Sequence, residues 1–381
     1  MLNAPSSRNY PSRALSSRRY AVFVPSLAGG GAQKVVVSLV NSWAGSGVAV
    51  DLVLGIAEGP FLPEVSPSVR IVDLKSPGVL GSLPGLIRYL NRERPRAMMS
   101  VMSHTNIAAL IARKVAVHRF RLVVSERNSL QGADFRSSAL RQRVIRWLMP
   151  RLYPNADAIT VVADAMRAEL SEFLGADPAS VVAIPNPAPG QESVSVLAAQ
   201  PAGHPWLELR ACPVILGVGR LTAQKDFTTL IDAFARVRAV RPARLILLGE
   251  GEDRAALAKR IAEAGLGKDI DMPGFVDNPY AFLARCDVFV LSSRWEGFPN
   301  VLIQAMACGA AVVSTDCPTG PREILAGGQW GALVPVGDAA AMAAAILHRL
   351  DTPERPDVRR RAEDYSLRSI ARSYLSVLDG A

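Results

Sequence analysis

The feature that most constrains this chain is an alternation, repeated twice along its length, of short apolar runs with longer amphipathic segments. The apolar runs are rich in Val, Ile and Leu, as strands buried on both faces of a parallel sheet are. They lie at residues 20–25, 48–54, 97–102, 122–125 and 158–162, and again at 214–218, 243–248, 288–291 and 311–314. Segments of helical periodicity, such as 33–44 and 106–115, separate them. The alternation predicts an α/β protein with two doubly wound parallel sheets.

A stretch rich in proline and glycine divides the two halves. Residues 185–204 hold four prolines and two glycines among small polar residues, which favours a linker or interdomain loop. We therefore expect a flexible polar leader at 1–19, domains at 20–190 and 191–360, and a C-terminal helix at 361–381 that returns toward the first domain. Ligands of open α/β sheets bind beyond the carboxyl ends of the strands, so we expect the site in the cleft between the domains.

Composition excludes several classes of protein. With 49% hydrophobic and 20% charged residues, the chain has the balance of a folded globular protein. It contains neither an apolar run of membrane-spanning length nor the apolar core of a signal peptide, so a cytoplasmic location is expected. The four cysteines stand singly, without the spacing of a metal or redox motif, which predicts reduced thiols.

The first motif, GGGAQK at residues 29–34, follows the first predicted strand and begins a helix. Glycines such as Gly30 and Gly31 let the backbone approach a phosphate, and a helix N-terminus supplies free N–H groups. The glycines lack the spacing of the dinucleotide fingerprint, and the second strand carries no acid at its end. A plain tight turn is therefore an open alternative.

The second motif, VGRLTAQKD at residues 218–226, places Arg220 and Lys225 just after a strand. A forked guanidinium and a compact ammonium suit a diphosphate, and together they would stabilise a leaving nucleotide. Two solvated loop cations are the alternative.

The third motif, SSRWEGFPNVLIQAMACG at residues 292–309, follows another apolar strand. Pro299 suits the first turn of a helix and Gly309 suits its end. Glu296 then lies at the helix entrance and Gln304 about one and a half turns inside. A carboxylate and an amide in this arrangement can hold vicinal hydroxyls while helix N–H groups bind phosphate. In a purely structural interpretation, Glu296 is an acid favoured by the helix dipole.

Together these motifs resemble the signature of glycosyltransferase family 4, retaining enzymes with the GT-B fold of two Rossmann-like domains facing across a cleft. The strings GFVDNPYAFL (274–283), the third motif, STDCPTGPREIL (314–325) and GALVPVGD (331–338) run in the family's order. With the first two motifs included, the likeness spans nearly the whole chain. The CPTGPREIL variant is similar to members that build bacterial surface polysaccharides and lipid-linked glycans from UDP-sugars.

The resemblance implies transfer of a hexose or N-acetylhexosamine from a UDP-sugar to an acceptor hydroxyl, with retention at the anomeric carbon. The implied site residues are Arg220 and Lys225 at the diphosphate, Glu296 at the sugar, Gly297, Phe298, Pro299 and Asn300 beside it, Gln304 at the ribose, Val276 at the base, and Gly30 and Gly31 facing the phosphates. No carboxylate pair of the DxD kind is evident within these motifs, so no obligatory metal or other cofactor is expected.

Two positions depart from the family's pattern. Gln33 and Gln304 stand where family members carry glutamates, so these positions can form hydrogen bonds but cannot transfer protons. His104, in MSHTN at residues 102–106, fits where many members place a histidine near the reacting sugar. A hydrogen-bonded structural histidine is the alternative. Because a leaving phosphate can itself take the acceptor proton, we assign His104 to the site without assigning it a role as base.

The segment from Phe135 to Tyr153 predicts a basic amphipathic helix, with arginines interleaved among apolar residues and Trp147. That pattern suits the surface of an anionic membrane and a lipid-linked acceptor, although a core-packing helix with a solvated basic face fits it too. The first 190 residues hold 22 Lys and Arg against 12 Asp and Glu, which also favours an anionic ligand or surface. No aromatic-rich or zinc-bearing module accompanies these charges, so nucleic acid is not an expected partner.

Three other functions can be weighed against transfer. A hydrolase needs a second carboxylate near Glu296, where the chain has Gln304. An epimerase of the same two-domain fold would release no glycoside, so product analysis separates it from a transferase. A catalytically silent membrane- or glycan-binding homologue need not bind nucleotide, so titration with UDP separates that function.

Overall fold

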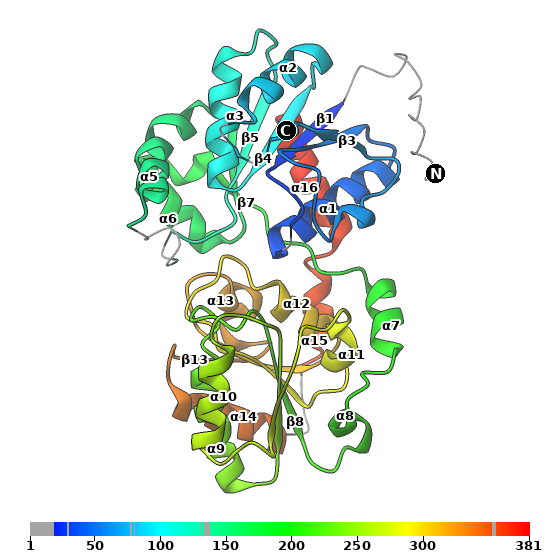
Figure 1. The fold of residues 1–381 in the computed structure, drawn as a ribbon, viewed down its shortest axis with the longest axis vertical. Helices are drawn as coiled ribbons and strands as arrows, with labels where there is room; N and C mark the ends of the chain where they lie inside the picture. Colours follow the sequence, from blue (N-terminus) through cyan, green and yellow to red (C-terminus); the bar gives the residue numbers. More distant parts are fainter. Residues whose placement is uncertain are drawn as a thin grey trace, which may run out of the picture.

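The computed structural model describes residues 19–28, 30–76, 78–79, 81–130, 132, 138–352 and 356–381. Two parallel sheets, each covered by helices, lie one above the other along the long axis of the molecule (Figure 1). The prediction of an α/β fold with two Rossmann-like domains is therefore confirmed.

The first sheet has the strand order β3-β2-β1-β4-β5-β6-β7, with parallel neighbours throughout. Its strands are β1 (Tyr20–Val24), β2 (Val50–Leu54), β3 (Arg70–Asp73), β4 (Ala97–Val101), β5 (Arg121–Ser125), β6 (Ala158–Val161) and β7 (Val181–Ala183). The helices of this part are α1 (Gly31–Gly45), α2 (Leu83–Glu93), α3 (Ser103–Val115), α5 (Leu140–Leu152) and α6 (Asp164–Leu174).

The second sheet has the order β10-β9-β8-β11-β12-β13 and is also parallel. Its strands are β8 (Val214–Val218), β9 (Arg244–Leu248), β10 (Ile270–Gly274), β11 (Val288–Leu291), β12 (Ala311–Thr315) and β13 (Ala332–Val334). The helices that follow β7 are α7 (Gln191–Ala199), α8 (Pro205–Leu209), α9 (Phe227–Val240), α10 (Arg254–Glu263), α11 (Pro279–Leu283), α12 (Asn300–Ala307), α13 (Pro321–Ile324), α14 (Ala339–Asp351), α15 (Val358–Glu363) and α16 (Leu367–Asp379).

The four strands at the sheet edges, β3, β7, β10 and β13, were absent from the sequence prediction. Each has a neighbour on one side alone, and their burial is partial: β3 alternates half-buried and exposed residues. Such strands lack the continuous apolar run by which doubly buried strands are recognised.

The predicted linker at 185–204 is wrong in one respect, because it contains the helix α7. Proline and glycine flank this helix rather than interrupt it: Gly190 precedes its first turn and Pro201 follows its end. Val194 of α7 is buried, and the helix packs against α11. The part of the segment that lies before this helix and connects the domains is therefore 185–190.

The chain passes between the domains at two places that lie side by side. At the first crossing Ala188 N–H donates to the carbonyl of Tyr365 at 2.6 Å, and Ala188 forms a parallel bridge with Ser366. The second crossing is at Tyr365 and Ser366. Beyond it, α16 packs against α1, β4 and β5 of the first domain, where Figure 1 shows α16 in red beside the blue α1. Trp43 Nε1–H fixes it by donating to the carbonyl of Ala371 at 2.9 Å.

Candidate active site

The carboxyl ends of both sheets face the same cleft, and loops from the two domains touch there. A Cβ added to Gly297 would lie 2.1 Å from the carbonyl oxygen of Arg127, and one added to Gly31 would lie 2.9 Å from Asn300 Nδ2. We call Gly30, Gly31, His104, Glu126 and Arg127 the first-domain wall. Arg220, Lys225, Val276, Glu296 and residues 297–304 form the second-domain wall.

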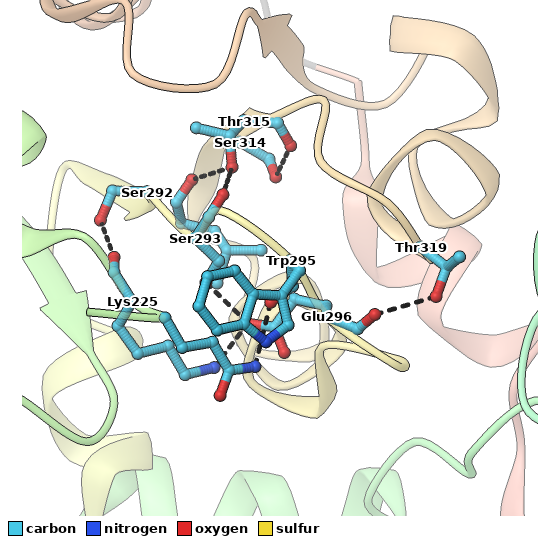
Figure 2. A network of polar contacts seen from close by, with 10 residues as sticks. Lys225, Ser292, Ser293, Trp295, Glu296, Ser314, Thr315 and Thr319 are labelled. Atoms are coloured by element: carbon cyan, nitrogen blue, oxygen red, sulfur yellow. Dashed lines mark hydrogen bonds and ion pairs between the residues drawn. The ribbon is translucent and has the colours of Figure 1, made fainter. Parts of the chain in front are cut away.

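Glu296 lies in the loop between β11 and α12 and is 6% exposed. Its Oε1 accepts hydrogen bonds from Lys225 Nζ at 2.5 Å and from Ser293 Oγ at 2.6 Å (Figure 2). Among the described residues no partner is recorded for Oε2, which leaves that oxygen for a ligand. The carboxylate is thus held by one oxygen and presents the other.

The backbone around Glu296 is fixed by the loop after β12. Glu296 N–H donates to the carbonyl of Pro318 at 2.7 Å, and Thr319 Oγ1–H donates to the carbonyls of Glu296 and Gly297 at 2.9 and 2.8 Å. Thr315 Oγ1–H donates to the carbonyl of Ser293 at 2.6 Å (Figure 2). These bonds make the entrance to α12 rigid.

Lys225 and Arg220, both in the loop after β8, differ in their surroundings. Lys225 is largely buried, and its carbonyl accepts a hydrogen bond from Ser292 Oγ at 2.6 Å. Arg220 is exposed and lines a pocket of about 380 Å³. The structure therefore brings one cation to the carboxylate and leaves the other at the mouth of the neighbouring pocket.

That pocket is predominantly apolar and lies over the carboxyl ends of β8, β9 and β10. Its lining residues are Val218, Gly219, Arg220, Leu248, Gly249, Glu250, Phe275, Val276 and Pro279. Val276, predicted at the base, is one of these lining residues. Phe275, which follows β10 directly, and Glu250, which comes two residues after β9, were not singled out from the sequence, although functional side chains of such folds gather at these strand ends.

The residues after Glu296 differ in their burial and in their position relative to α12. Phe298 is buried and packs edge-on against Tyr365, with the ring centroids 5.8 Å apart. Pro299 precedes α12, and Asn300 begins it. Gln304 is half-buried on the same helix, and no side-chain hydrogen bond of Gln304 is recorded within the described part of the chain.

In the first-domain wall, Gly30 precedes α1 with φ 124°, a conformation that favours glycine. No side chain caps α1, and its first turn contains no acidic residue. The free N–H groups at this end of the helix therefore remain available to an anion in the cleft.

His104 is the second residue of α3, the helix that follows β4, so it lies in the first turn of that helix. Burial and, to a smaller extent, the nearby charge of Arg141 together lower the pKa of His104 to about 4. The imidazole is therefore neutral at neutral pH.

A chain of side chains that sequence reasoning missed joins the two walls. Arg127 Nη1–H donates to Asn186 Oδ1 at 2.6 Å, and Asn186 Nδ2–H donates to Asn300 Oδ1 at 2.8 Å. Arg127 is 5% exposed, and its Nε and Nη2 have no partner among the described residues. The signal was present in SERN at 125–128, a charged pair directly after an apolar strand.

No group of three or more His, Cys, Asp or Glu side chains in the described ranges could hold a metal ion. None of the helices described is long and apolar enough to cross a membrane.

Two facing parallel α/β domains, with cations and a held carboxylate at the strand ends, form the GT-B fold, which many glycosyltransferases have. Two family models match the chain: "Glycosyl transferase 4-like domain" over residues 30–187 and "Glycosyl transferases group 1" over residues 212–352. The chain belongs to glycosyltransferase family 4 and is a glycosyltransferase.

Curated relatives and solved structures agree with this assignment. The N-acetylgalactosamine-N,N'-diacetylbacillosaminyl-diphospho-undecaprenol 4-alpha-N-acetylgalactosaminyltransferase of Campylobacter jejuni is 28% identical over 385 residues, covering 95% of this chain and 100% of the relative. The amylovoran biosynthesis glycosyltransferase AmsD of Erwinia amylovora is 26% identical, covering 78% of this chain and 80% of the relative. Anabaena HepE, solved with UDP and glucose, superposes with a TM-score of 0.77 at 19% identity, covering 96% of this chain and 100% of HepE. These relatives, named as transferases, do not favour the epimerase alternative.

Proposed function

We propose that this enzyme transfers a hexose or N-acetylhexosamine from a UDP-sugar to a hydroxyl of a lipid-linked or growing polysaccharide glycan, with retention. The observation that carries the proposal is the buried Lys225–Glu296 pair at the entrance of α12, beside the 380 Å³ pocket. Support for the donor comes from HepE, which was solved with UDP and glucose. Support for the acceptor comes from the Campylobacter relative, whose name specifies a diphospho-undecaprenol substrate.

The donor would lie along the second-domain wall. The base would enter the apolar pocket beside Val276, the ribose would reach Gln304, and the sugar would bind Glu296 through its open oxygen Oε2. Arg220 and Lys225 would hold the diphosphate, with the backbone of 297–300 and the N-terminus of α1 close by. Phe298 would contribute through its backbone, because its ring packs on Tyr365.

Catalysis would rest on positioning and on stabilising the leaving UDP. Lys225 and Arg220 place two positive charges where the diphosphate charge grows, so we expect transfer without a divalent metal; full activity in EDTA tests this. A neutral imidazole of low pKa is a weak base. His104 would therefore orient and polarise, and the leaving phosphate would take the acceptor proton.

A panel of UDP-Glc, UDP-Gal, UDP-GlcNAc, UDP-GalNAc and GDP-Man tests the donor assignment. The true donor should raise the midpoint of thermal unfolding in proportion to its occupancy, and it should yield a glycoside with a suitable lipid-linked acceptor. Arg220→Ala should weaken UDP binding by about tenfold or more, since it removes a charge-assisted contact. Unchanged turnover in Arg220→Ala would remove that residue from the site.

Helix α5 would bind the surface of a membrane, where the enzyme would reach its lipid-linked acceptor. One face of this helix packs inward through Ile145, Met149 and Leu152, so it is in part the core helix of the alternative interpretation. Leu140, Val144 and Trp147 are nonetheless 75%, 45% and 58% exposed. They lie among arginines of the same helix, and Arg151 stacks on the ring of Trp147. Phe135 and Arg136, at the start of the predicted segment, lie outside the described residues.

Vesicle flotation tests the membrane contact. Binding should require anionic lipid and fall with salt, because the arginines provide the attraction. Trp147→Ala should weaken binding to the same vesicles, and Trp330→Ala, in the second domain, serves as the matched control. Equal binding to neutral vesicles would contradict the electrostatic part.

A further inference from the structure

A buried carboxyl group lies behind His104 and has no place in the chemistry described so far. Glu126 follows β5 directly and is 2% exposed. Its Oε1 accepts a hydrogen bond from Ser103 Oγ at 3.0 Å, and its Oε2 accepts one from Tyr153 OH at 2.8 Å. Burial raises the pKa of the Glu126 carboxyl to about 7, while these two hydrogen bonds act in the opposite direction. A buried acid is costly, so its retention calls for a reason.

The turn from β4 to α3, which carries His104, is held in an unfavourable conformation. Met102 has φ 83°, in the left-handed region where a side chain is strained. Thr105 Oγ1–H donates to the carbonyls of Val101 and Met102. Such a turn persists when the surrounding contacts determine it.

Those contacts form one connected network. Asn106 accepts from Ser100 Oγ at 2.8 Å and donates to the carbonyl of Ser125 and to Tyr153 OH, both at 3.0 Å. Tyr153 in turn donates to Glu126. The network therefore runs from the end of β4, through α3, to the end of β5, and Glu126 is its charged member.

His104 lies between two residues that the network holds, Ser103 and Thr105. Within the described ranges no hydrogen bond of the imidazole itself is recorded, so the ring is placed by its own backbone turn. The orientation of the ring in the cleft therefore depends on how firmly the first turn of α3 is fixed.

We propose that Glu126 is a positioning residue for sugar transfer, which acts through Ser103 to fix the first turn of α3 and with it the imidazole of His104. The inference rests on the site role proposed above for His104. Glu126 is almost wholly buried and both of its oxygens accept hydrogen bonds within the protein, so we expect it to make no contact with the donor. Its loss should therefore lower kcat and leave donor binding as it is.

Asp51 offers a matched control for a buried carboxylate with a structural function alone. It is 0% exposed, lies near the start of β2 and away from the cleft, and accepts hydrogen bonds from Tyr89 OH at 2.8 Å and Arg19 Nη1 at 2.6 Å. Asp51→Asn should lower the midpoint of thermal unfolding and change kcat of the folded enzyme by less than about twofold.

The experiment compares the wild-type full chain with Glu126→Gln, Ser103→Ala, the double variant, His104→Ala and Asp51→Asn. The measured quantities are kcat, KM for the UDP-sugar that supports transfer, the Kd for UDP and the midpoint of unfolding. Glu126→Gln and Ser103→Ala should each lower kcat on the order of 10- to 100-fold, as expected of a small misplacement, with KM and Kd within about twofold. The double variant should be no less active than the less active single variant, because both changes act on the same Ser103–Glu126 contact: the amide has one acceptor oxygen and cannot accept from both Ser103 and Tyr153 as the carboxylate does.

Several outcomes would overturn the inference. They are an unchanged kcat in Glu126→Gln or Ser103→Ala, a parallel loss of UDP affinity, full additivity of the two changes, or an unchanged kcat in His104→Ala. Ser103→Ala decides the matter if Glu126→Gln does not fold, because it removes the bond and keeps the carboxyl paired with Tyr153. No transfer by the wild type with any donor of the panel would overturn the proposed function and this inference together. Transfer by the wild type with an indifferent Glu126 would overturn this inference alone.

Discussion

The two walls of the cleft are built differently. In the second-domain wall, Glu296 and Ser293 come from one stretch of sequence and Lys225 comes from a second. Lys225 and Ser293 each donate a hydrogen bond directly to Glu296. In the first-domain wall, one or two residues come from each of several separate strand ends. Glu126 and Arg127 are linked to the cleft through other side chains, Ser103 and Asn186. The second-domain wall is therefore organised by contiguous sequence, and the first-domain wall is organised by topology.

The difference predicts how each wall fails when it is altered. If the donor binds as proposed, removing a side chain from the second-domain wall should remove a direct contact to the donor and, in some cases, leave the buried partner of that side chain unpaired. Removing one from the first-domain wall shifts another residue. The first kind of change should reduce donor binding and turnover together, and the second should change turnover or stability alone.

The largest effect is expected for Lys225→Ala. It leaves the carboxylate of Glu296 buried without its counter-charge, and at the proposed donor position it also removes a cation from the diphosphate. Loss of one such contact should cost about 2–4 kcal/mol of transition-state stabilisation, or on the order of 10²- to 10³-fold in kcat/KM. Steady-state kinetics with the identified donor measures it.

Glu296→Gln is the control for that variant. The amide can still accept from Ser293 and Lys225, so the fold should be kept, while the sugar loses a charged acceptor. UDP should bind Glu296→Gln as it binds the wild type, and kcat/KM should fall on the order of 10²-fold. Equal loss of UDP affinity in both variants would contradict the separation of the sugar from the diphosphate contact.

The second effect concerns the first-domain wall and pH. The pKa of His104 is about 4 in the folded chain and 6.5 in its ordinary state, so the unfolded chain binds the proton first as pH falls. The contribution of neutral His104 to the free energy of unfolding is complete above pH 6.5, and it declines as the pH falls below that value. By pH 5 the loss should be about 2 kcal/mol, at 1.4 kcal/mol for each pKa unit.

Denaturant titrations of wild type and His104→Gln at pH 5 and pH 8 measure this loss. The difference between the two proteins should favour the variant more at pH 5 than at pH 8. Glu126 acts in the opposite sense, because its raised pKa makes its ionisation costly as pH rises through about 7. An equal difference at both pH values would show that His104 is not buried as described.

The contrast between the walls also explains what could be predicted from the sequence. Strands buried on both faces were recognised by their apolar runs, and β3 was missed because it has just two apolar residues, Ile71 and Val72, between Arg70 and Asp73. Glu296, Lys225 and Arg220 were singled out because their motifs are local. The link from Arg127 through Asn186 to Asn300 joins residues 59 and 114 positions apart, so it depends on which strand ends meet in the fold.

The third effect concerns Gln304, which stands where family members carry a glutamate. An amide at the ribose should contribute an ordinary hydrogen bond of about 0.5–1.5 kcal/mol. Gln304→Ala should therefore raise the Kd for UDP about threefold to tenfold, with kcat within about twofold. Gln304→Glu should bind at least as well as the wild type, since a carboxylate is the stronger acceptor. Isothermal titration with UDP separates the three proteins, and an indifferent Gln304→Ala would place the ribose elsewhere.

The smallest effect is expected where the two walls meet, at Asn186. Asn186→Ala removes both of its hydrogen bonds, whereas Asn186→Asp keeps an acceptor for Arg127 and removes the donor to Asn300. Because a carboxylate would neutralise a guanidinium that is almost wholly buried, Asn186→Asp should be the more stable of the two, by about 1 kcal/mol. If the bond to Asn300 couples the domains, both variants should lose about twofold to fivefold in kcat/KM despite their different stabilities. If kcat/KM instead fell more in the less stable of the two variants, Asn186 would serve the first-domain wall alone.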